Sequence, residues 1–108
     1  MVQEPNGPNG LPSPQLGVYG ISVAAQLSGV GAQSLRLYEE HGLLTPDRTA
    51  GGTRRYSSDD IDRIRRIATI LAAGVNLAGI GRILALEADN ADLRRRLLDL
   101  GDDIGRAR

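Results

Sequence analysis

Three arginines and a tyrosine gather in one short stretch of the chain: Arg48, Arg54, Arg55 and Tyr56, with Asp47 as the one acid beside them. A guanidinium group can fork onto a phosphate or onto the edge of a guanine. Because the formal net charge of the whole chain is zero, this local excess of positive charge indicates a surface for a polyanion. The alternative is a solvated hairpin that carries its charges for solubility.

The overall composition excludes several kinds of site but does not identify a ligand. All thirteen positive side chains are arginine, which suits phosphate recognition and is equally typical of a GC-rich genome. There is no cysteine and one histidine, His41. Disulfides, thiolate metal sites, a cysteine nucleophile and a histidine-rich metal site are therefore excluded. We expect no metal, no cofactor and, since no catalytic constellation is present, no enzyme.

Two short amphipathic segments precede the arginine cluster, and both are expected to be helices. Ser22 is expected to cap the first helix and Gly29 to end it. The second is expected over about residues 32–40, where Leu35 and Tyr38 lie one turn apart and can pack back onto the first. The spacing predicts a helix-turn-helix, although an αα-hairpin with a glycine turn would show the same pattern.

The arginine cluster itself is expected on a β-hairpin. Residues 43–46 and 53–57 are expected to be short extended segments, and the glycines between them permit a tight reversal over residues 47–52. Ser57, with Asp60 three positions later, predicts the start of a third helix by a capping box.

Apolar residues near the C-terminus follow a different period. The steps between them alternate between four and three, which indicates a heptad seam and a helix that pairs with a second copy. The helix could instead fold back onto its own domain. The seam consists of Leu86, Asn90, Leu93, Leu97, Leu100 and Ile104.

The chain is expected to divide into three parts. Residues 1–17 hold four of the five prolines and are expected to be a disordered tail. Residues 18–86 form the expected DNA-binding domain, and residues 87–108 the dimerisation helix with a frayed end. No apolar run approaches membrane-spanning length, so no membrane partner and a cytoplasmic, nucleoid-associated location are expected.

Residues 21–86 resemble the DNA-binding domain of the MerR family of transcription regulators. Within that family, three stretches look most like the heat-shock repressor (HspR) branch: residues 32–36, 51–57 and 74–80. The family pattern is carried by Leu35, Arg36, Tyr38, Glu39, Gly42, Leu43, Leu44, Pro46, Arg48, Gly52, Thr53, Arg54, Arg55, Tyr56, Ser57, Asp60 and Ile61.

The resemblance implies a mainly α fold, a winged helix-turn-helix with a small β-hairpin wing and an antiparallel C-terminal dimerisation helix. It implies a homodimer on double-stranded DNA with an inverted-repeat operator. The DNA-binding residues that it implies are Gln33, Ser34, Arg36 and Tyr38 on the second helix, and Arg48, Thr53, Arg54, Arg55 and Tyr56 in the wing.

The departures from the family pattern bear on the type of regulator. No effector domain is seen after the DNA-binding part, and no cysteine is available for metal or redox sensing. A repressor of stress genes, regulated by a protein partner, therefore fits better than a ligand-triggered activator. In the heat-shock branch that partner is the DnaK chaperone as co-repressor. A MerR-like protein-interaction module, such as a chaperone modulator without a DNA role, is the alternative from another class.

Overall fold

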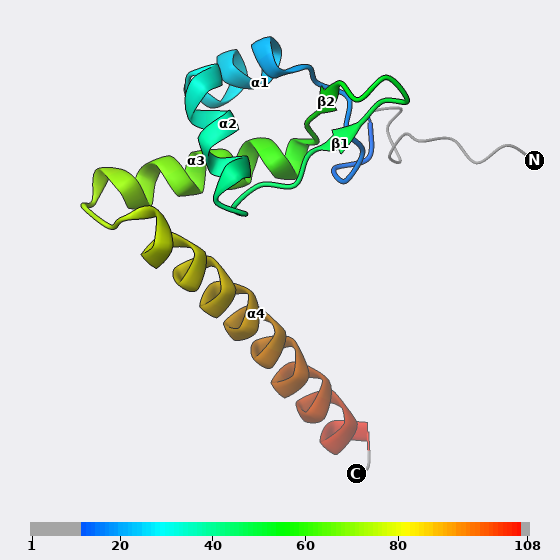
Figure 1. Cartoon of the computed structure of the whole chain (residues 1–108). Helices are drawn as coiled ribbons and strands as arrows, with labels where there is room; N and C mark the ends of the chain where they lie inside the picture. The colour runs from blue at the N-terminus through cyan, green and yellow to red at the C-terminus, as the bar shows by residue number, and fades with distance from the viewer. Residues whose placement is uncertain (1–11, 107–108) are drawn as a thin grey trace, which may run out of the picture.

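A computed structural model describes residues 12–106 of the protein, with side chains for residues 12–101. One end of the molecule is formed by three helices and a hairpin, and a long fourth helix runs away from them as a rod (Figure 1). The mainly α winged helix-turn-helix fold predicted from the sequence is confirmed. The elements are α1 (Ile21–Ser28), α2 (Ala32–Glu40), β1 (Asp47–Arg48), β2 (Arg54–Arg55), α3 (Ser58–Ala72) and α4 (Leu77–Arg106).

The turn between α1 and α2 depends on Gly29, as its position in the sequence predicts. Gly29 has a φ of 75°, in the left-handed region, and its amide donates a hydrogen bond to the carbonyl of Ala25. The expected cap at Ser22 is wrong. Gly20 occupies the N-cap position without a side-chain hydrogen bond, because the helix already begins at Ile21 and Ser22 lies inside its first turn.

A single apolar core holds α1, α2 and α3 together. Ala24 and Leu35 have no exposed surface, so the first two helices meet closely through a small side chain. Burial of this apolar surface is the main term that stabilises a domain of this size. The core consists of Ala24, Leu35, Tyr38, Leu43, Leu44, Tyr56, Ile61, Ile64, Ile67, Ile70, Ile80 and Leu84.

The first hairpin strand lies later in the chain than the sequence predicts, whereas the second falls within the expected segment 53–57. β1 and β2 pair antiparallel, with Asp47 opposite Arg55 and Arg48 opposite Arg54. The expected extended segment at residues 43–46 is wrong. Leu43 and Leu44 are both buried in the core, whereas successive residues of a strand point to opposite faces.

The start of α3 is confirmed as a capping box. The Ser57 hydroxyl accepts a hydrogen bond from the amide of Asp60, and the Asp60 carboxylate accepts one from the amide of Ser57. At the other end, Gly74 has a φ of 94° and turns the chain toward α4. Asn76 then caps α4 by accepting a hydrogen bond from the amide of Gly79 at 2.8 Å.

Helix α4 continues without a break through the expected domain boundary at residue 86. Its first part packs on α3 through Ile80 and Leu84, and an ion pair of 2.5 Å joins Arg66 to Glu87. Beyond that point the helix leaves the domain (Figure 1). The alternative in which it folds back onto its own domain is therefore wrong for the part of the helix whose side chains are placed.

The expected disordered tail is wrong for residues 12–17. The carbonyl of Pro14 accepts a hydrogen bond from the amide of Asp59 at 3.0 Å, and the amide of Gly17 donates one to the Asp47 carboxylate at 3.2 Å. Tyr19 then forms an isolated β-bridge with Tyr56. We call residues 12–19 the N-terminal strap. Residues 1–11, the rest of the expected tail, lie outside the described residues.

Candidate nucleic-acid interface

The outer face of α2 gathers three of the predicted DNA-binding residues. Leu35 and Tyr38 fill the core from the inner face of the helix, so the helical period turns Gln33 and Arg36 outward. Gln33 and Arg36 are exposed, and Ser34 is half-buried. Gln33, Ser34 and Arg36 line one shallow hollow together with Leu37 and Glu40. The side chains expected to face the major groove therefore share one surface.

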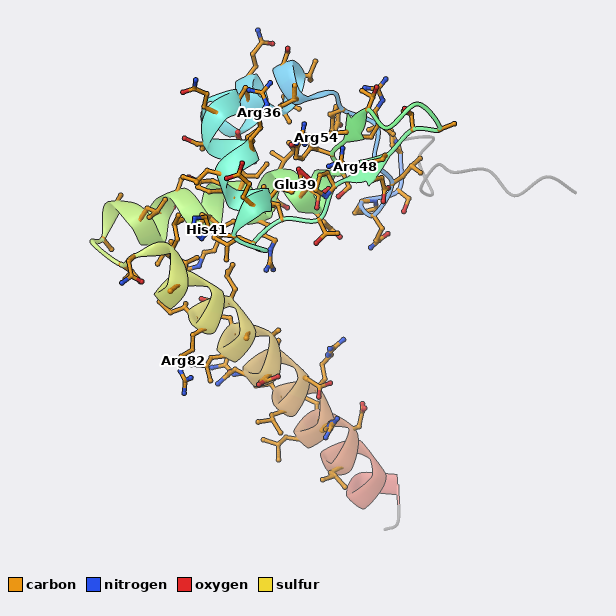
Figure 2. All side chains as sticks on the ribbon, in the orientation of Figure 1. Arg36, Glu39, His41, Arg48, Arg54 and Arg82 are labelled. Carbon is orange, nitrogen blue, oxygen red and sulfur yellow. The ribbon has the colours of Figure 1, made fainter. Side chains whose placement is uncertain are left out.

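The wing arginines Arg48 and Arg54 lie close to this surface and share one acid, Glu39 of α2. Arg48 Nη2 lies 2.8 Å from Glu39 Oε2, and Arg54 Nε lies 2.6 Å from Glu39 Oε1. Figure 2 shows these three side chains between α2 and the hairpin, with Arg36 one turn earlier on α2. The carboxylate thus ties both strands of the wing to the second helix.

Glu39 belongs to the family pattern in the sequence, but it was not among the predicted DNA-binding residues. The hydrogen bond from Arg54 lowers the pKa of Glu39 below its ordinary value, and the charges of Arg54 and Arg48 act in the same direction against desolvation. The carboxylate is therefore ionised at neutral pH. The available signal was an acid on the predicted second helix, close in the chain to three arginines in an otherwise neutral protein.

The two tyrosines predicted to contact DNA are core residues; burial argues against the contact for Tyr56, and the contact of Tyr38 stays a prediction. The Tyr38 side chain is 4% exposed and Tyr56 is fully buried, and burial raises the pKa of both phenols. The Tyr56 hydroxyl has no hydrogen-bond partner among the described residues. In this conformation Tyr56 has no atom that could reach a phosphate, so it supports the wing from beneath.

Thr53 and Arg55, the remaining predicted wing residues, have different surroundings. Thr53 is exposed in the hairpin loop, and its carbonyl and amide pair with the backbone amide and the hydroxyl of Thr49. Arg55 is half-buried, and its Nη1 lies 3.2 Å from the position that a Cβ on Gly20 would take. The guanidinium of Arg55 therefore lies against the start of α1, on a different side from the pair held by Glu39.

The arginines of α3 are occupied by structural contacts. Arg63 donates to the carbonyl of Leu43, and Arg65 donates to the carbonyl of Leu27 at the end of α1, both at 2.6 Å. Such a cation at a helix C-terminus satisfies a free carbonyl and complements the helix dipole. Arg66 pairs with Glu87 as described. Among the helical residues of the described domain, this leaves Arg36 as the exposed arginine beside the wing.

Four leucines of the predicted seam are exposed on α4. Leu86, Leu93, Leu97 and Leu100 are between 56% and 67% exposed. Leu86 and Asn90 also line an open hollow at the start of the projecting part, together with Ile83, Glu87, Ala91 and Arg94. The last seam residue, Ile104, lies outside the part whose side chains are described. A row of large apolar side chains left in water indicates a surface that another molecule covers.

The described residues hold no group of three or more histidine, cysteine or acidic side chains placed to bind a metal ion. Within the same residues, none of the helices combines the length and the apolar character needed to cross a bilayer.

The geometry is that of a helix-turn-helix followed by a basic hairpin wing, and comparison with known proteins agrees. The family described as "MerR HTH family regulatory protein" matches residues 19–87. This chain belongs to that family.

Named relatives and solved structures give the same result. The chain is 52% identical to HspR of Streptomyces coelicolor over 84 residues, which cover 77% of this chain and 56% of that protein. It is 33% identical to the HTH-type transcriptional regulator GlnR of Bacillus anthracis, covering 69% of this chain and 58% of that one. The chain thus spans little more than half the length of these curated relatives.

A solved structure also superposes on the fold. It is HiNmlR, a MerR family regulator lacking the sensor domain, in a crystal structure bound to promoter DNA. The TM-score is 0.62 at 27% identity, over 79% of this chain and 65% of that one.

Proposed function

We propose that the protein is a sequence-specific DNA-binding transcription regulator that acts as a homodimer. The observation that carries this proposal is the shared outer face of α2, where Gln33, Ser34 and Arg36 line one surface beside the wing arginines. Glutamine can pair with the edge of an adenine and arginine with guanine. An arginine of the wing can supply a phosphate contact, which gives affinity and register.

The exposed seam of α4 supports the dimer. A two-fold pair of antiparallel α4 helices would cover the exposed leucines of both copies, and Asn90 would select the register of the pair. A two-fold protein carries two copies of α2, so the DNA site is an inverted repeat whose half-sites lie about one helical turn, ~10 base pairs, apart.

The similarity to HspR supports a narrower role. We propose a cytoplasmic repressor of heat-shock or other stress genes, with the DnaK chaperone as co-repressor. The support is the 52% identity to HspR over 84 residues, a match that covers 77% of this chain. The rival role is a protein-interaction module that keeps the fold without binding DNA.

Selection of DNA by the full chain tests the proposal directly. The protein is incubated with a pool of random double-stranded DNA, and bound duplexes are amplified and sequenced over several rounds. An enriched inverted repeat is expected. Absence of any enriched sequence contradicts the DNA-binding role and favours the interaction module.

Two further measurements test the finer role. Transcription in vitro from a promoter that contains the enriched site is expected to fall when the protein is added, and an increase would indicate an activator. Footprints with and without purified DnaK test the co-repressor, because the protected region should appear at lower protein concentration when the chaperone is present.

A further inference from the structure

The two arginines that share Glu39 are not equivalent in their hydrogen bonding. Both terminal nitrogens of Arg48 are engaged, Nη2 with Glu39 and Nη1 with the carbonyl of Gly52 at 3.0 Å. Arg54 uses only Nε, and its two terminal nitrogens have no partner among the described residues. Since a guanidinium carries five N–H donors, four of them on the terminal nitrogens, Arg54 keeps its outer edge available.

Exposure alone would favour Arg48 over Arg54 as the arginine that binds a phosphate. The Arg48 side chain is 47% exposed and that of Arg54 is 31% exposed. The strongest arginine–phosphate contacts, however, are bidentate and use two parallel N–H donors of the guanidinium. Within the described part of the chain, Arg54 keeps all four terminal N–H donors free, whereas each terminal nitrogen of Arg48 already uses one of its two N–H groups, so this guanidinium is fixed between Glu39 and the hairpin turn.

From this geometry we propose that Glu39 is a positioning residue for DNA recognition. It holds Arg48 as an internal brace between α2 and the hairpin turn, and it orients Arg54 so that the free end of this guanidinium meets one backbone phosphate. The inference rests on the proposed DNA-binding function, and it assigns separate roles to two arginines that the sequence groups together.

The position of Glu39 has a consequence for selectivity. A carboxylate at the DNA surface repels phosphates, so it lowers affinity for DNA of any sequence. The same carboxylate fixes the wing relative to α2, which favours the one register in which the α2 side chains meet their bases. Glu39 therefore exchanges general affinity for discrimination between sequences.

Glu39→Gln and Glu40→Gln form a matched pair for the test. Both remove one negative charge at adjacent positions of α2, but the described residues contain an ion pair only for Glu39. Affinity is measured for the duplex enriched by the wild-type chain and for a scrambled duplex of the same composition. For Glu39→Gln the ratio of the two affinities is expected to fall about tenfold, the loss of one charged hydrogen bond. Glu40 lines the same hollow as Gln33 and Arg36, so Glu40→Gln measures the effect of removing a charge from this surface, and its ratio is expected to fall clearly less than that of Glu39→Gln, because most of its effect raises both affinities together.

The two arginines are tested separately through the salt dependence of binding. Arg54→Gln is expected to lower the slope of log affinity against log salt by about one, because one phosphate contact is lost. Arg48→Gln is expected to keep the wild-type slope and to lose discrimination as Glu39→Gln does. Circular dichroism melting shows whether each variant is folded. If Glu39→Gln does not fold, the two arginine variants still test whether Arg54 binds a phosphate and Arg48 acts as a brace.

The outcomes separate this inference from the proposed function. If the wild-type chain enriches no duplex, the DNA-binding function itself is wrong. If it does, and Glu39→Gln keeps the wild-type ratio of affinities, the positioning role of Glu39 is wrong. A slope that falls by about one for Arg48→Gln would show that Arg48 binds a phosphate itself, which overturns its role as a brace.

Discussion

The amide of Gly17 donates a hydrogen bond to the carboxylate of Asp47 at 3.2 Å, and this bond joins the N-terminal strap to the first strand of the wing. The approach is so close that a Cβ on Gly17 would lie 2.7 Å from the carbonyl oxygen of Arg55 and 2.8 Å from Asp47 Oδ2. The strap is thus part of the support of the wing.

Gly17→Ala is expected to lower the free energy of unfolding by about 1–3 kcal/mol, because the backbone at Arg55 must move to admit the methyl group. Urea unfolding followed by circular dichroism measures the change. Gly51→Ala is the matched control, since a Cβ there meets its nearest atom at 3.9 Å and its φ is not positive. An equal loss in both variants would show that the strap contributes nothing specific.

Tyr56→Phe tests whether the buried tyrosine contacts DNA. Its hydroxyl is buried without a partner among the described residues, so its removal should leave stability unchanged or raise it by up to about 1 kcal/mol. Affinity for the enriched duplex and its salt slope should match wild type. A lower salt slope for Tyr56→Phe would show that the hydroxyl contacts a phosphate, as expected from the sequence.

The pH dependence of stability tests the ionised state of Glu39. Because the hydrogen bond from Arg54 lowers the pKa of Glu39 below its ordinary value of 4.5, its stabilising contribution is fully present above that value. It is lost as the pH falls through the lowered pKa of the folded state. The free energy of unfolding of wild type should therefore exceed that of Glu39→Gln at pH 7 by about 1 kcal/mol, since solvent screens the partly exposed arginines.

This difference should disappear as the solution is made strongly acidic, where Glu39 is protonated in both the folded and the unfolded state. Urea titrations at a series of pH values from 7 downward measure it, and Glu40→Gln corrects for the general change in charge. A difference that persists at the lowest pH would mean that the carboxylate is not the source of the effect.

Leu97→Glu and Leu98→Glu test the dimer seam with two neighbouring residues of nearly equal exposure, 67% and 69%. Only Leu97 lies in the heptad seam. Leu97→Glu should raise the dimer dissociation constant by about 100-fold or more, because each copy would bury an unpaired carboxylate. Leu98→Glu should leave the constant near its wild-type value. Sedimentation equilibrium measures both, and the reverse order would place the seam on another face of α4.

Gln33→Ala tests base recognition by α2. The variant should lose about 1–3 kcal/mol on the enriched duplex and little on the scrambled one, because a contact to a base edge is lost and no phosphate contact is. Gln26→Ala makes the same change at an exposed position of α1 and should alter neither affinity. Equal losses on both duplexes for Gln33→Ala would show that Gln33 contacts the backbone.

Features with a local physical cause could be predicted from the sequence. The glycine turn at Gly29 and the capping box of Ser57 and Asp60 each depend on residues a few positions apart, and the structure has both. The outward direction of Arg36 follows from the helical period of α2, once Leu35 and Tyr38 are assigned to the core.

Features that depend on distant partners could not be predicted. The wing strands have two residues each, too few to show an alternating pattern. Glu39 finds its partners nine and fifteen positions away, in the hairpin. Tyr56 lies beside two arginines in the chain and resembles a ligand contact, yet its β-bridge to Tyr19 turns the ring into the core.

In the proposed dimer, the number of residues in the unbroken helix α4 sets the distance between the two half-sites. Its 30 residues carry both the contact with α3 and the exposed leucines, and a straight helix turns by about 100° with each residue added. An insertion of one residue after Leu84 would leave the DNA-binding surface of α2 intact and rotate it relative to the same surface of the second copy. Paralogues that differ only in the length of this segment would therefore read the same half-site in differently spaced or differently phased repeats.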